Sequence, residues 1–105
     1  MDAGPDTRHG QVSLRHDSGI TVVVLTGEID FLVVREFEEG QGLAPVPVDA
    51  LDAGAVTYIG SIGLALLLRW ATPAGGPLPL RSSPQLDRVL ELTQLTGLFQ
   101  RTPGP

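Results

Sequence analysis

The chain has 105 residues, of which 42% are hydrophobic and 18% are charged, and its formal net charge is -5. This length and composition predict one globular domain with a small core. The absence of cysteine excludes disulfides, thiolate metal ligands and a cysteine nucleophile. The acidic charge disfavours nucleic acid as a partner, because nucleic-acid-binding domains carry basic patches.

The ends of the chain and its least polar stretch indicate where in the cell the protein is expected. Residues 1–10 are polar and lack the apolar core of a signal peptide. The uncharged stretch from Ala53 to Leu68 is shorter than the roughly 20 residues that a membrane span needs. We therefore expect a cytoplasmic protein without membrane insertion, with a flexible leader over 1–10, a single domain over 11–101 and a flexible tail over 102–105.

Strand and helix signals alternate along the chain. In order, they predict a strand over 11–16, a strand over 20–26, a helix over 31–39, a strand over 46–51, a helix over 61–72, a strand over 78–81 and a helix over 84–95. This β-β-α-β-α-β-α order predicts an α/β fold with a small mixed sheet flanked by helices. Strands separated by helices pair in parallel through right-handed crossovers.

Turn and capping residues set the expected boundaries. The turn Asp17-Ser18-Gly19 predicts a hairpin between the first two strands. Gly27 is expected to break the second strand, and Gly97 to close the last helix. Ser83, which is followed by proline, is expected to cap the last helix. Leu98 and Phe99 should pack back on the core.

Four segments carry a family pattern, namely Leu25-Thr26-Gly27-Glu28-Ile29-Asp30, Asp52-Ala53-Gly54-Ala55-Val56-Thr57-Tyr58-Ile59-Gly60-Ser61-Ile62-Gly63-Leu64, Arg88-Val89-Leu90-Glu91-Leu92-Thr93 and Thr96-Gly97-Leu98-Phe99. Together, in this order and on these element types, they resemble the STAS domain of anti-sigma-factor antagonists. The usual family text of the second segment is Asp-Leu-Ser-Gly-Val-Thr-Phe-Ile-Asp-Ser-Ser-Gly-Leu. The resemblance implies the STAS fold over nearly the whole chain after the leader.

The resemblance also implies a phosphorylation switch that this chain lacks. In the family, the second Ser of Asp-Ser-Ser-Gly is phosphorylated by a partner kinase that is also an anti-sigma factor. The added charge of about -1.5 to -2 releases the partner. Here Ile62 stands at the acceptor position and Gly60 at the position of the acidic residue. Ser61 matches the first Ser, which is not the usual acceptor.

Several of these positions have two interpretations. Ser61 is expected to be a helix N-cap, with a substitute phosphosite as the alternative. Asp30 is either a helix cap or a partner contact, and Gly60 is expected to relax the turn between strand and helix. Asp52, after the strand predicted over 46–51, is expected to anchor a loop through a hydrogen bond.

The helix predicted after Ser61 carries two stripes. One of them, formed by Leu64, Leu67, Leu68 and Ala71, suits the core. The other is formed by Ile62, Leu66, Arg69 and Trp70. We favour a partner as its cover, with Trp70 as an exposed anchor, over burial under neighbouring helices or under the loop from Pro73 to Pro79. The candidate partner-binding residues are therefore Asp30, Gly60, Ser61, Ile62, Gly63, Leu66 and Trp70.

The sequence contains no recognisable catalytic site. His9 lies in the leader and His16 beside a turn, without a nucleophile nearby in sequence, and no residues are spaced as metal ligands. We therefore expect neither enzyme activity nor a cofactor or metal. The resemblance implies a regulator that binds an anti-sigma factor or a histidine-kinase-like ATPase domain. Two alternatives remain, a soluble accessory subunit of a membrane transport complex and a scaffold piece of a larger signalling assembly.

Overall fold

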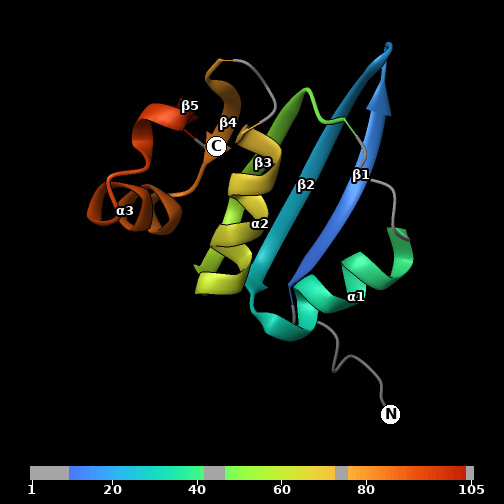
Figure 1. Ribbon diagram of the computed structural model, residues 1–105, viewed down its shortest axis with the longest axis horizontal. Helices are drawn as coiled ribbons and strands as arrows, with labels where there is room; N and C mark the ends of the chain where they lie inside the picture. The colour runs from blue at the N-terminus through green and yellow to red at the C-terminus, as the bar shows by residue number, and fades with distance from the viewer. Residues whose placement is uncertain (1–9, 42–46, 73–75, 104–105) are drawn as a thin grey trace.

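The computed structural model describes residues 10–41, 47–72 and 76–103. The elements are β1 (Gln11–Asp17), β2 (Ile20–Ile29), α1 (Phe31–Gln41), β3 (Ala50–Ile59), α2 (Ser61–Ala71), β4 (Leu78–Ser82), α3 (Pro84–Leu92), the 3-10 helix η3 (Thr96–Leu98) and β5 (Phe99–Pro103) (Figure 1). The expected α/β class and element order are confirmed, and β5 is added at the end of the predicted order.

The strands form one mixed sheet in the order β1-β2-β3-β4-β5. β1 and β2 are antiparallel, and the other three neighbouring pairs are parallel. Each parallel connection moves to the next strand in the same direction. Right-handed crossovers then place all three α-helices on one face. Alternation in β4 agrees, because Leu78, Leu80 and Ser82 are buried whereas Pro79 and Arg81 are exposed.

The hairpin between β1 and β2 closes as the sequence predicts. Ser18 and Gly19 form a two-residue turn, and both have positive φ, 52° and 85°. These are the signs of a type I′ turn, whose twist matches that of the flanking strands. The tip is therefore set by the local sequence.

β2 does not break at Gly27, which corrects the sequence prediction. The strand continues to Ile29, and Gly27 lies inside it with a φ of 73°. The pairing of β2 with β3 shifts register on both sides of this glycine. Gly27 therefore accommodates an irregularity in the ladder and does not end the strand.

The strand predicted over 46–51 is instead β3, which begins at Ala50 and is ten residues long. Val46 lies outside the described residues. The two register shifts explain the error, because each bulge interrupts the alternation of buried and exposed residues. As a result, the buried side chains Leu51, Ala53, Val56 and Ile59 do not follow a period of two.

The core lies between the covered face of the sheet and the three helices. Its buried residues include Val23, Leu25 and Ile29 of β2, Val33 and Val34 of α1, Leu66 and Leu67 of α2, and Leu86 and Leu90 of α3. In Figure 1, α2 lies in front of β3, whereas α1 lies at the lower ends of β1 and β2. No helix within the described ranges is long and apolar enough to cross a membrane.

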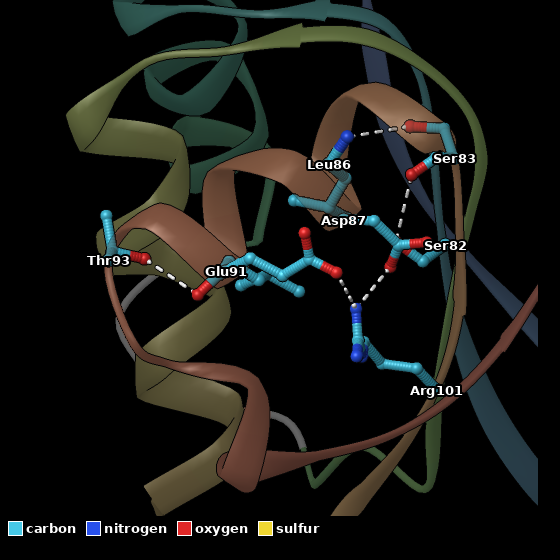
Figure 2. Close-up of polar contacts among 8 residues, drawn as sticks. Ser82, Ser83, Leu86, Asp87, Glu91, Thr93 and Arg101 are labelled. Atoms are coloured by element: carbon cyan, nitrogen blue, oxygen red, sulfur yellow. Dashed lines mark hydrogen bonds and ion pairs between the residues drawn. The ribbon is translucent and has the colours of Figure 1, made fainter.

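The start of α3 confirms the predicted cap. Ser83 Oγ accepts a hydrogen bond from Leu86 N at 3.1 Å, and Pro84 is the first helical residue (Figure 2). The helix ends at Leu92, earlier than the predicted Leu95, and Gln94, two residues beyond this end, has a positive φ of 60°. Gly97 lies in η3, so it does not close α3.

β5 is a strand that the sequence pattern did not predict. Phe99 is buried in the core as expected, whereas Leu98 is 39% exposed. Arg101 joins this edge strand to α3, with Nη1 at 2.8 Å from Asp87 Oδ1 and 3.7 Å from Glu91 Oε2 (Figure 2). β5 includes Thr102 and Pro103, the first half of the expected tail. Residues 104–105 and the leader residues 1–9 lie outside the described residues.

Candidate functional site

Two strand-to-helix junctions lie side by side at the carboxyl edge of the parallel strands. Ile29 ends β2 and pairs in register with Ile59, which ends β3. Gly60 N donates a hydrogen bond of 3.0 Å to Ile29 O, which ties the second junction to the first. The positions expected to bind a partner around Asp30 and Ser61 are therefore brought together.

Asp30 is the helix cap of the first junction. Its Oδ1 accepts a hydrogen bond from Val33 N at 3.0 Å, and its backbone oxygen accepts from Val34 N at 3.1 Å. The carboxylate thus satisfies one of the free N–H groups at the start of α1. The capping interpretation of Asp30 is confirmed, and its contact with a partner stays a prediction.

Ser61 is not the cap of α2, which corrects the prediction. Gly60 occupies the N-cap position with φ of -88° and ψ of 178°, and no side chain caps this helix. Ser61 is the first helical residue and is exposed. The start of α2 therefore presents backbone N–H groups and an exposed hydroxyl at the molecular surface.

Exposed apolar side chains surround these junctions. Phe31 and Tyr58 are each 54% exposed, and Ile62 is 43% exposed. We call the set Asp30, Phe31, Tyr58, Ser61 and Ile62 the junction surface. Phe31 follows the cap Asp30 directly and is exposed. Tyr58 was part of the family pattern but was not proposed as a site residue. Its place one residue before buried Ile59 was the signal, because neighbours in a strand face opposite sides.

A groove of about 370 Å³ runs from this surface between α1 and α2. Its lining residues are Phe31, Val34, Arg35, Glu38, Ile62, Ala65 and Arg69. The charged members are paired locally, since Arg69 bonds Glu38 across the groove and Arg35 Nε lies 3.2 Å from Glu39 Oε2. The Arg35 guanidinium also lies over the Phe31 ring, 5.9 Å from its centroid. The groove is therefore apolar with a largely neutralised rim.

Three of the predicted contact residues belong to the interior. Leu66 is 3% exposed. Gly63 is buried, and a Cβ added there would lie 2.8 Å from side-chain atoms of both Ile29 and Ile59. Trp70 is half-buried and packs edge-on against Phe37, with ring centroids 5.7 Å apart at 79°. Helix α1 therefore packs against Trp70, which supports the alternative of burial under a neighbouring helix for this residue, while Leu66 lies in the core and Ile62 and Arg69 are exposed.

Asp52 lies within β3 and away from the junction surface. Its Oδ1 accepts a hydrogen bond from Gly54 N at 3.3 Å, beside the bulge, and its Oδ2 lies 3.7 Å from Arg81 Nη1 of β4. The expected local hydrogen bond is present. It stabilises an irregular strand instead of a loop, and Asp52 has a structural role.

The described residues offer no arrangement for metal chemistry. No group of three or more His, Cys, Asp or Glu side chains within them could hold a metal ion. His16 lies in β1 near the hairpin turn, and its Nδ1 is 3.2 Å from Thr21 Oγ1. His9 lies outside the described residues.

A family model described as "Mlab, STAS domain" matches residues 12–100. The chain belongs to the STAS family. A crystal structure of an anti-sigma factor antagonist from Mycobacterium paratuberculosis is similar over 94% of this chain and 88% of its own, with a TM-score of 0.70 and 26% sequence identity. No curated protein sequence matches the chain. The resemblance of the sequence motifs to this STAS family is confirmed, and the similarity supports a protein-binding regulatory role.

Proposed function

We propose that this STAS-family protein binds an anti-sigma factor, or a related histidine-kinase-like ATPase domain, through the junction surface, without a serine phosphorylation switch at position 62. The observation that carries the proposal is Ile62, which is 43% exposed in the first turn of α2, next to the exposed residues Phe31 and Ser61. The protein would act by binding, without catalysis, and in the cytoplasm.

An exposed isoleucine at this point favours a partner contact. Burying apolar surface is worth roughly 25 cal/mol per Å², and Ile62 shares its groove with Phe31, so a partner could cover both side chains together. Isoleucine has no hydroxyl to phosphorylate. Charge cannot therefore be added at that atom position to release the partner.

The charge around the junction surface indicates what kind of partner surface fits. Glu28 is exposed and pairs in register with Tyr58, and Asp30 lies at the start of α1. Neither carboxylate forms an ion pair with the described basic residues. A partner with a basic rim around an apolar centre would complement this edge.

The test is a calorimetric titration of the purified protein with each anti-sigma factor of its source organism. We expect Ile62→Asp to weaken binding by roughly tenfold or more, because the interface would bury an unpaired carboxylate. Leu92→Asp is the matched control, since Leu92 is 75% exposed on α3, away from the junction surface. Equal affinity of wild type and Ile62→Asp, or no binding to any anti-sigma factor, would overturn the proposal.

The absence of a switch has its own test. The bound partner is incubated with ATP and this protein, and the products are analysed by mass spectrometry. We expect no stoichiometric phosphate on the chain. A stoichiometric phosphate on Ser61, which is exposed, would show that the switch has moved by one residue.

The alternative of a soluble accessory subunit is an outcome of the same work. Co-purification with the ATPase of a membrane transport complex, in place of an anti-sigma factor, would favour it. Binding to neither class would favour the scaffold alternative.

A further inference from the structure

We propose that Tyr58 is the residue that determines which partner the junction surface accepts, and that Gly60 leaves room for its ring. This inference rests on the proposed function. It goes further by assigning selectivity to a side chain outside the position of the phosphoacceptor.

The strand fixes the direction of Tyr58. Ile59, the next residue, is buried at 7% exposure and pairs with Ile29 over the core. Alternation therefore places Tyr58 on the opposite side of the sheet, where its side chain is 54% exposed. The Tyr58 ring approaches the carboxyl edge of the sheet from the face without helices. Ile62 approaches the same edge from the face that the helices cover.

Gly60 provides the room that the ring occupies. A Cβ added at Gly60 would lie 3.3 Å from the Tyr58 hydroxyl oxygen, 3.7 Å from Cε2 and 3.8 Å from Cζ. The hydroxyl end of the ring therefore lies beside Gly60. A Cβ at position 60 would displace this end by a few tenths of an ångström.

The backbone itself does not require glycine there. Gly60 has φ of -88° and ψ of 178°, which is ordinary extended backbone that any residue adopts. The expectation that Gly60 relaxes the turn is therefore wrong. Space for the Tyr58 ring is the reason that the structure gives for glycine at this position.

The surroundings of the ring define the partner group that would cover it. Glu28 lies opposite Tyr58 in the β2–β3 register and is exposed. An aromatic face beside a carboxylate that pairs with no described basic residue is complementary to apolar and basic side chains. A rigid aromatic ring at the centre of such a contact is typical of residues that carry most of the binding energy.

A double-mutant cycle on the anti-sigma factor that binds best tests the inference. We expect Tyr58→Ala to weaken binding roughly 10- to 100-fold. Gly60→Ala should weaken it by no more than a few-fold, because the new Cβ would shift the hydroxyl end of the ring by only a few tenths of an ångström. The double variant should bind like Tyr58→Ala alone, since Gly60 acts only through the ring. Leu92→Ala, on an exposed residue of α3, is the control and should change nothing.

Selectivity is measured against the other anti-sigma factors of the source organism. The ratio of affinities for the best and the weaker partners should fall about tenfold in Tyr58→Ala. An unchanged ratio, or effects of Tyr58→Ala and Gly60→Ala that multiply, would overturn the inference. If Ile62→Asp abolishes binding while Tyr58→Ala does not, the proposed function stands and this inference fails. If no anti-sigma factor binds the wild type, both fail.

Discussion

The β3–α2 and β4–α3 junctions use the same local design with opposite results. Each joins the end of a parallel strand to the start of a helix, and the sequence predicted a serine cap in both. At β4–α3 the cap is real, and Ser82 and Ser83 are each 2% exposed. At β3–α2 no side chain caps the helix, and Ser61 and Ile62 are exposed.

The difference shows which junction is free to bind. At β4–α3, Ser82 Oγ donates to Ser83 O at 3.2 Å, and Ser83 Oγ in turn accepts from Leu86 N, so polar groups are satisfied within the fold (Figure 2). At β3–α2 no side chain caps the helix start, and the Ser61 side chain is exposed. A partner can therefore contact the start of α2 without displacing an internal hydrogen bond.

The largest loss of stability is expected at Gly63, where the β3–α2 junction packs against the core. Gly63→Ala should lower the free energy of unfolding by about 1–3 kcal/mol, because the new Cβ would overlap Ile29 and Ile59. Urea unfolding gives the measurement. Gly40→Ala in α1 is the control, since a Cβ there meets nothing within 4 Å. Equal stability of the two variants would contradict the close packing of α2 on the strands.

Removal of the real cap should have the next largest effect. Ser83→Ala should cost about 0.5–2 kcal/mol of stability, because it leaves Leu86 N without its acceptor in a buried site. Thermal unfolding followed by circular dichroism measures the loss, and Ser83→Asn should recover part of it if the site has room. No change in Ser83→Ala would mean that the cap contributes nothing.

The Arg101 contacts should contribute less. Arg101→Met keeps the apolar stem and removes the ion pairs with Asp87 and Glu91, which should cost no more than about 1 kcal/mol because the groups are partly exposed and screened by solvent. The loss should shrink at high salt. Arg88→Met is the control, as Arg88 forms no ion pair with the described residues. Equal losses in both variants would show that these ion pairs do not stabilise α3 against β5.

Local chemistry and tertiary packing explain which predictions succeeded. The Ser83 cap was predictable because it depends on neighbouring residues only. β3 was placed wrongly because its bulges hide the period of two. The burial of Trp70 was missed because Phe37 of another helix covers it, which one helical pattern cannot reveal. The junction surface was found only in part, since the exposure of Tyr58 depends on the register of two strands.

The smallest change in stability is expected at Ser61, and there stability and binding should separate. Ser61→Ala should shift the free energy of unfolding by no more than about 0.5 kcal/mol, whereas a true cap would lose more. Ser61→Glu should stabilise α2 by about 0.3–1 kcal/mol, because its first turn holds no acidic residue to interact with the helix dipole.

The same Ser61→Glu substitution should weaken binding of an anti-sigma factor, since it places a carboxylate beside Ile62 on the junction surface. Ser61→Gln, of the same size without the charge, is the control for both measurements. If Ser61→Glu raises the free energy of unfolding and lowers the affinity for the partner, the uncapped start of α2 favours binding and lowers the stability of the fold. If Ser61→Glu lowers both together, the exposed hydroxyl has a structural role that its position does not explain.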